Sequence, residues 1–251
     1  MSIKFPLSTL GLAVFAAMGG ATQSAFAEEV TTKANTKTKI EVIQVTAQKR
    51  SQSINEIPMA ITAFNANDMS EMGIEGTEDL AAVIPGFNFS DTAFGPPVYT
   101  LRGVGFNESS ATATATVGIY VDEVAIPFPI MTKGVSLDIE RVEVLKGPQG
   151  TLYGRNSTAG AINYIAAKPT ESFEAGFKGS LANYQTISGE GFVSGALVDN
   201  LNARIAIKSV YTGKGWQESV SRDDTLGEQD KLSARLTFDW QISDATNALV
   251  R

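Results

Sequence analysis

Apolar and polar residues alternate over long stretches in the C-terminal third of the chain. From residue 231 to 242, Leu232, Leu236 and Trp240 share one set of alternate positions, and Arg235 and Asp239 share the other. Stretches 201–208 and 173–177 follow the same rule, and 189–198 follows it less strictly. Because side chains alternate between the two faces of a strand, we expect about four strands of roughly ten residues with short polar turns. Such strands suit a transmembrane β-barrel wall or an amphipathic sheet in a soluble protein, and the alternation leaves both open.

The middle of the chain carries shorter apolar runs, some with the periodicity of a helix and others with that of a strand. Helices are expected at 66–72, with Asn65 or Asn67 as the cap, and at 77–84, with Thr77 as the cap. Residues 135–139 are expected to form one helical turn. Strands are expected at 60–64, 98–104, 117–124, 141–145 and 161–167. Short strands mixed with short helices predict an α+β domain of roughly 120 residues.

The first 27 residues have the features of a secretory signal peptide. Lys4 is their only charge, residues 7–17 form an apolar run too short to cross a bilayer, and Ala25 and Ala27 give a small-x-small cleavage pattern. A buried or anchoring N-terminal helix is the alternative. Residues 28–39 are polar and rich in threonine and lysine, which predicts a flexible tether.

Composition narrows the functional classes. The formal net charge of −7 argues against nucleic acid as a partner. The chain has no cysteine and no histidine, so disulfides, thiolate metal sites and a serine–histidine hydrolase are excluded for these residues. No pair of carboxylates suggests an enzyme, and we expect no cofactor and no metal site. Asp122 and Glu123 are interpreted as a solvated turn, and Asp223 and Asp224 as part of a polar loop.

A glycine-rich segment, KGPQGTLYGRNSTAG (146–160), lies between two predicted strands. It does not match a phosphate-binding loop, because Arg155 and Asn156 stand where that loop needs lysine and serine or threonine. In the preceding run RVEVL, Val142 and Val144 share the face expected to pack on the domain's helices. Arg141 and Glu143 would then point away from the domain core.

Several of these segments together resemble one family. ERVEVLKGPQGTLYGRNSTAGAINYIAAKP (140–169) is similar to the end of the plug domain of TonB-dependent outer-membrane receptors. TLRGVG (100–105) and VGIYVDEV (117–124) resemble the middle strands of that domain, and IEVIQVTAQKR (40–50) resembles the TonB box that precedes it.

The resemblance implies a chain divided into a signal peptide (1–27), a tether with the TonB box (28–50), a plug domain (51–169) and the first strands of a β-barrel (170–251). Its fold class would be an α+β plug, a small mixed sheet with short helices, followed by antiparallel strands of an incomplete transmembrane barrel. The plug of a complete receptor fills a barrel of about 22 strands. Four strands cannot close a barrel, so the sequence is expected to be the front of a longer receptor or a truncated product.

The resemblance also implies roles for particular residues. A scarce solute, by default a ferric siderophore or similar metal chelate, would bind from outside, and TonB would pair with the box from the periplasm by adding a strand. TonB coupling is assigned to Ile43, Gln44, Val45, Thr46 and Ala47. Contacts between plug and barrel are assigned to Arg102, Arg141, Glu143 and Arg155. Ligand-facing loops are assigned to Phe94, Phe106 and Asn107.

The implied location is the outer membrane, with lipid around a complete barrel and with the plug and TonB box reaching the periplasm. Two alternatives stay open. One is a truncated, plug-like periplasmic binding module without transport activity, and the other is a secreted enzyme that uses carboxylates.

Overall fold

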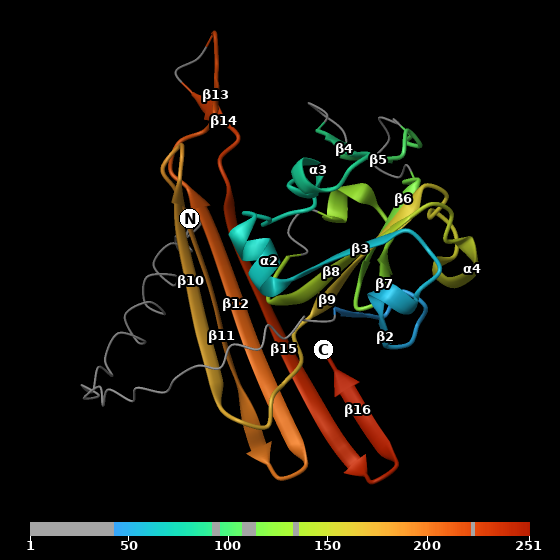
Figure 1. The fold of residues 1–251 in the computed structure, drawn as a ribbon. Helices are drawn as coiled ribbons and strands as arrows, with labels where there is room; N and C mark the ends of the chain where they lie inside the picture. The colour runs from blue at the N-terminus through green and yellow to red at the C-terminus, as the bar shows by residue number, and fades with distance from the viewer. Residues whose placement is uncertain (1–42, 92–95, 107–113, 133–135, 222–223) are drawn as a thin grey trace, which may run out of the picture. The chain divides into compact units, whose positions relative to one another are not determined.

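Two five-stranded sheets hold most of the regular structure (Figure 1). The computed structural model describes residues 43–91, 96–106, 114–132, 136–221 and 224–251. The predicted signal peptide and tether lie outside these residues. No helix within the described ranges is both long and apolar enough to cross a membrane.

The first sheet is mixed and has the strand order β3-β8-β9-β6-β7. Only the β6–β9 pair is parallel. Its strands are β3 (Ile61–Asn65), β6 (Val117–Val121), β7 (Val124–Ile126), β8 (Ile139–Lys146) and β9 (Gly160–Ala166). Two-stranded sheets accompany it, formed by β1 (Gln44–Val45) with β2 (Gln52–Ser53) and by β4 (Phe87–Ser90) with β5 (Val98–Leu101). We call residues 43–169 the mixed-sheet domain.

One face of the mixed sheet packs on two short helices. Val142 and Val144 are fully buried in a core that also contains Met69 of α2 (Ala66–Glu71) and Leu80 of α3 (Leu80–Val83). The expected orientation of the two valines is therefore confirmed. The helix α2 begins as expected, because the side chain of Asn65 accepts a hydrogen bond from the Asp68 amide in a capping box.

Other expected elements differ from the structure. Thr77 does not cap a helix, because its buried hydroxyl bonds to the Tyr164 hydroxyl at 2.8 Å and α3 starts three residues later. The expected strand 117–124 is a hairpin that turns at residues 122 and 123. Residues 136–139 are not helical, and Ile139 begins β8. The sequence prediction also missed β4, the turn-like helix η2 (Pro129–Thr132) and α4 (Gly150–Tyr153), which lies inside the glycine-rich segment.

Glycine is required at the end of that segment by a close backbone approach. A Cβ atom added to Gly160 would lie 2.3 Å from the carbonyl oxygen of Leu145 and 2.6 Å from a methyl carbon of Leu101. Real Cβ atoms do not approach backbone oxygens so closely, so strand β9 would have to move away from β8. The glycine therefore shapes the domain by letting β9 begin close beside the end of β8.

Gly160→Ala is expected to destabilise the domain by roughly 2–4 kcal/mol, because the added methyl group overpacks a site bounded by backbone. The urea concentration at which the domain becomes sensitive to protease measures this loss. Gly150→Ala is the matched control, since nothing lies within 4 Å of its added Cβ and alanine favours the helix α4. Equal sensitivity of the two variants would contradict the packing argument.

The second sheet is antiparallel, with the order β10-β11-β12-β15-β16, and we call it the large sheet. Its strands are β10 (Glu174–Ala182), β11 (Thr186–Val198), β12 (Leu201–Thr212), β15 (Asp230–Ser243) and β16 (Thr246–Val250). Among described residues, β10 and β16 each pair on one side only, so the sheet is open. A small hairpin of β13 (Gln217–Glu218) and β14 (Thr225–Leu226) extends the β12–β15 connection.

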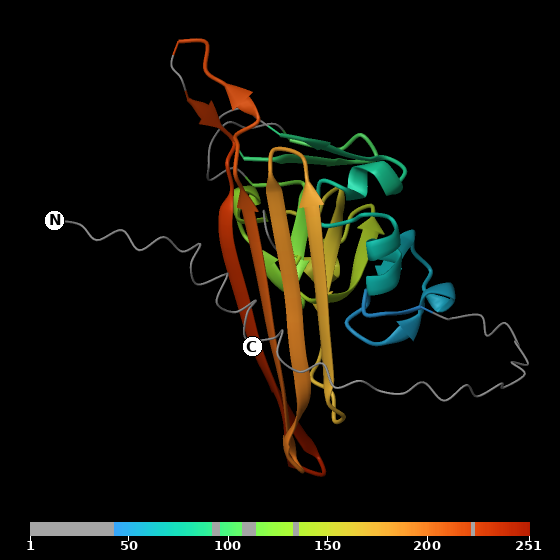
Figure 2. The same ribbon diagram turned by 90° about the vertical axis from the view of Figure 1, so that its left-hand side faces the viewer.

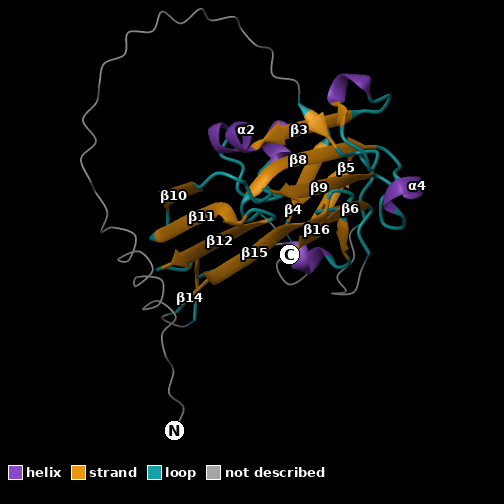
Figure 3. Cartoon of the chain, turned by 90° about the horizontal axis from the view of Figure 1, so that it is seen from below, coloured by secondary structure: helices purple, strands orange, loops and turns teal. Residues whose placement is uncertain are grey.

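The two faces of the large sheet differ as the alternation predicts. On the outer face, Phe177, Leu181, Ile205, Leu236 and Trp240 are all at least 45% exposed. The inner face carries Arg204 and Thr237, which are buried against the mixed-sheet domain. Figure 2 views this sheet broadside, with the domain behind it, and Figure 3 shows the two sheets as separate layers. A polar face toward the domain and an apolar face away from it fit a barrel wall.

Candidate functional site

Residues Ile43–Ala47, which the sequence assigned to coupling, form a docked segment of the mixed-sheet domain. Gln44 and Val45 pair with Ser53 and Gln52 as the short sheet β1–β2. The side chains of Val45 and Ala47 are completely buried. They pack on the face of the mixed sheet opposite the helices, with Ile57, Tyr153 and Leu145 among their neighbours.

A buried carboxylate holds the middle of this segment. One oxygen of Glu143, Oε1, accepts hydrogen bonds from the Thr46 amide at 2.7 Å and from the Thr46 hydroxyl at 3.2 Å. The same oxygen accepts from Arg141 Nε at 2.9 Å, and Arg141 Nη2 lies 3.4 Å from the Thr46 hydroxyl. The Glu143 side chain is 0% exposed. A charge-assisted bond to a backbone amide in so buried a place is strong and specific.

Aromatic and charged groups surround the end of the segment. The Tyr153 ring lies edge-on to Tyr120 at a centroid distance of 4.9 Å, and the ammonium group of Lys49 lies 5.0 Å from the Tyr153 centroid. Burial raises the pKa of the Tyr153 phenol, and the negative charge of Glu143 raises it further. Tyr153 is therefore neutral at physiological pH and acts as a packing group here.

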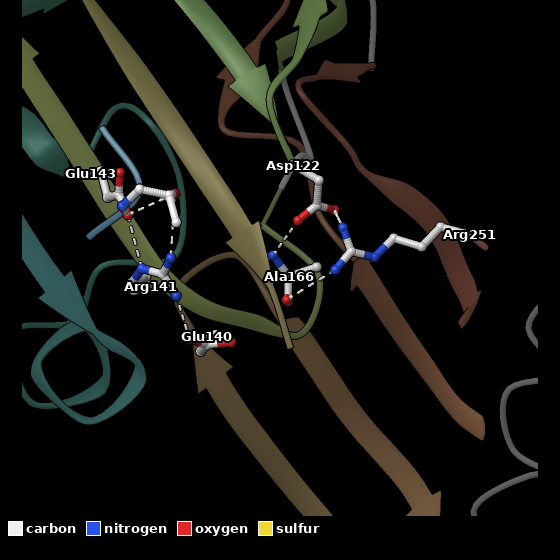
Figure 4. A network of polar contacts seen from close by, with 7 residues as sticks. Asp122, Glu140, Arg141, Glu143, Ala166 and Arg251 are labelled. Carbon is white, nitrogen blue, oxygen red and sulfur yellow. Dashed lines mark hydrogen bonds and ion pairs between the residues drawn. The ribbon is translucent and has the colours of Figure 1, made fainter. Parts of the chain in front are cut away.

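Arg141 and Glu143 were both expected to contact the barrel. In the described residues they bind Thr46 and each other, and Arg141 also contacts its neighbour Glu140 (Figure 4). The assignment of Arg141 to a barrel contact stays a prediction. The two residues do lie on the face opposite the valines. That face is covered by residues 43–47, so the fully buried Glu143 has no surface to offer a barrel strand.

The large sheet is joined to the mixed-sheet domain by another set of charges. Arg204 of β12 makes a bidentate ion pair with Asp138, with Nε–Oδ2 and Nη2–Oδ1 distances both 2.6 Å. Both side chains are less than 10% exposed. The guanidinium carbon of Arg204 also lies 3.7 Å from the centroid of the Phe192 ring. This pair is buried between the two sheets.

Neighbouring inner-face residues bind the backbone beside Asp138. The Asp138 amide donates to Glu190 Oε1 at 2.7 Å, and Lys208 donates to the Ser136 carbonyl at 3.2 Å. Arg235 of β15 donates to the Leu137 carbonyl at 2.6 Å. Three strands of the large sheet therefore hold residues 136–138 in place.

A further contact lies at the edge strand β16. Arg251 forms an ion pair with Asp122 and donates a bond of 3.4 Å to the Ala166 carbonyl (Figure 4). Asp138, Arg204 and Arg251 were not predicted from the sequence as contacts. The signal was present for Arg204, because it occupies a polar position of an alternating strand. The sequence does not show which loop residue such an arginine meets.

The remaining predicted residues lie elsewhere. Arg102, in the turn after β5, and Arg155, after α4, are exposed in the described structure, and neither contacts the large sheet through an interaction found there. Their assignment to barrel contacts stays a prediction. Phe106 is 53% exposed beside Pro96, Tyr99 and Pro129. Phe94 and Asn107 lie outside the described residues.

A cleft lies between helix α2 and the inner face of β10, β11 and β12. Its lining includes Met69, Glu75, Lys178, Glu190 and Lys208. No group of three or more metal-binding side chains occurs within the described ranges. The cleft is thus a charged gap between domain and sheet, without the features of a metal centre.

Comparisons with known proteins find relatives that cover the mixed-sheet domain and the large sheet. The model of the family described as TonB-dependent Receptor Plug Domain matches residues 53–161. The pesticin receptor of Yersinia enterocolitica is 29% identical over 224 residues, which is 86% of this chain and 32% of that protein. The ferripyoverdine receptor of Pseudomonas aeruginosa is 27% identical over 63% of this chain and 19% of its own length.

Solved structures agree on the fold. The ferric yersiniabactin uptake receptor from Yersinia pestis superposes with a TM-score of 0.67 at 23% identity, covering 74% of this chain and 29% of the other. The pyoverdine outer-membrane receptor of Pseudomonas aeruginosa gives the same TM-score at 20% identity, covering 82% and 29%. The chain spans about a third of the length of the pesticin receptor.

Proposed function

Because the chain belongs to the TonB-dependent outer-membrane receptors, we propose that it is the front part of a receptor that imports a ferric siderophore with energy supplied through TonB. The observation that carries this proposal is the docked segment 43–47, hereafter the coupling segment. It lies ahead of a plug domain and is held by a small number of specific contacts. Relatives named as ferripyoverdine and ferrioxamine B receptors support an iron chelate as the solute.

The geometry requires the coupling segment to leave its site before it pairs with another protein. Backbone groups of Gln44 and Val45 are paired with β2, the Ile43 carbonyl accepts from Ile54, and the Thr46 amide is bound by Glu143. Strand addition by TonB uses these same groups. The docked and TonB-bound states of the segment therefore exclude each other.

Solute binding and TonB pairing, the two steps of uptake, are proposed to occur at opposite ends of the plug. In Figures 1 and 2, β4, β5 and the β13–β14 hairpin lie toward one end, and β2, beside the coupling segment, lies away from that end. Phe106 follows β5 and is assigned to solute contact, together with Phe94 and Asn107. Solute would bind at the β4–β5 end, and TonB would act on the segment from the periplasmic side. The apolar outer face of the wall would contact membrane lipid.

Val45→Pro is expected to abolish energised uptake while leaving solute binding unchanged. Proline removes the amide hydrogen at 45 and fixes φ, so the segment loses a donor needed for strand pairing. Uptake and equilibrium binding of a radiolabelled ferric chelate, measured on the same cells, test this. Thr36→Pro, in the predicted polar tether, is the control and should import normally. Normal import by Val45→Pro would overturn the proposed coupling role.

A plug-like periplasmic binding module without transport activity remains the second candidate. Antibody against residues 53–161 separates the two on fractionated cells. A receptor places the signal in the outer membrane, whereas a binding module places it in the soluble periplasmic fraction.

A further inference from the structure

The turn between β6 and β7 has an unusual backbone for its residues. Asp122 and Glu123 both have positive φ angles, 48° and 68°, without being glycine. Residues that carry a side chain adopt this left-handed conformation rarely. Sequence analysis interpreted the pair as a solvated turn. In the structure the side chain of Asp122 is only 16% exposed.

Strand β9 fixes this turn from within the plug. The Asp122 amide donates to the Tyr164 carbonyl at 2.8 Å, and the Glu123 amide donates to the Asn163 side chain at 3.2 Å. Asp122 Oδ1 accepts from the Ala166 amide at 2.9 Å, next to the point where the chain leaves the plug. These contacts define the direction in which each carboxylate points.

The two carboxylates contact different parts of the molecule. Glu123 makes an ion pair of 2.9 Å with Lys49, two residues beyond the coupling segment. Lys49 in turn lies over the ring of Tyr153, which packs with Val45 and Ala47. Asp122 makes its ion pair with Arg251, which directly follows the wall strand β16. Adjacent residues of one turn therefore bind Lys49, just beyond the coupling segment, and Arg251 at the end of the wall.

We propose that the Asp122–Glu123 turn is a positioning element that couples docking of the coupling segment to seating of strand β16 on the plug. Both ion pairs favour the same turn conformation, so loss of one weakens the geometry on which the other depends. Such coupling acts equally in both directions. Its purpose rests on the proposed function, because release of the segment to TonB would then loosen the plug from the wall at Arg251.

The test uses a single reporter cysteine, Val45→Cys, in the receptor embedded in outer-membrane vesicles. The 251 residues contain no native cysteine, and Val45 is 0% exposed when docked. Arg251→Gln, a change on the wall, is expected to raise the thiol labelling rate at position 45 about 3- to 10-fold. Lys208→Gln removes a wall contact at Ser136 and is the matched control. It should leave the labelling rate at 45 unchanged.

A second variant tests whether the two ion pairs act on the coupling segment through the same turn. Lys49→Gln should also raise labelling at 45, and Lys49→Gln with Arg251→Gln should raise it by less than the product of the two single effects. An Arg251→Gln effect no larger than that of Lys208→Gln, or strictly multiplicative effects, would overturn the proposal. The assay contains neither solute nor TonB, so its outcome is independent of whether uptake itself is demonstrated.

Discussion

Replacing Arg204 with alanine is expected to loosen residues 136–138 of the plug from the wall. The substitution leaves the Asp138 carboxylate, which is 8% exposed, without the guanidinium that binds both of its oxygens. Breaking one side of a buried ion pair costs about 3–5 kcal/mol, because an uncompensated charge stays behind. A Leu137→Cys reporter, at a position only 4% exposed, should then label roughly 100-fold faster or more.

Two controls belong to this experiment. Lys214→Ala removes an ion pair with Glu218 whose side chains are 54% and 73% exposed, and it should change labelling at 137 little. Exchanging the charges, with Arg204→Asp and Asp138→Arg together, should restore part of the protection. If Arg204→Ala labels no faster than Lys214→Ala, the pair does not hold the plug to the wall.

Glu143→Ala is expected to free the coupling segment. The substitution removes the acceptor for the Thr46 amide and hydroxyl and leaves Arg141, whose side chain is 14% exposed, without its buried partner. Losses of this kind cost about 2–3 kcal/mol. The Val45→Cys reporter should therefore label roughly 30- to 100-fold faster, and TonB should bind the receptor without solute.

Thr46→Val is the milder variant for comparison. It removes the hydroxyl's bonds to Glu143 at 3.2 Å and from Arg141 at 3.4 Å but keeps the amide bond, so labelling at 45 should rise only a few-fold. General unfolding of the plug by Glu143→Ala would also expose Leu137→Cys, whereas release of the segment alone leaves that reporter protected. Unchanged labelling at 45 in Glu143→Ala would show that Glu143 does not hold the segment.

The sequence predicted those features that depend on local pattern. The alternation in residues 231–242 predicted a strand with one apolar face, and Asn65 was one of the two residues expected to cap α2. The faces of β8 were also predictable, because Val142 and Val144 share one side of a strand. In each case the information lies within a few neighbouring residues.

Long-range pairing could not be predicted in the same way. Glu143 and Thr46 are 97 residues apart, and Arg204 and Asp138 are 66 apart. An exposed charged face and a face covered by another segment have the same local sequence, so Glu143 was assigned to the barrel. Asp122 and Glu123 were interpreted as solvated for the same reason, since their partners Arg251 and Lys49 lie far away in the chain.

The most direct test of the account is a cross-linking scan of the coupling segment in energised cells. Cysteines placed one at a time at positions 43–47 of the receptor would be paired with single cysteines along the periplasmic domain of TonB. If TonB pairs with the coupling segment, disulfides form at these positions, increase when solute is added and follow the register of one added strand. A receptor that imports solute yet forms no cross-link at any of the five positions would contradict it.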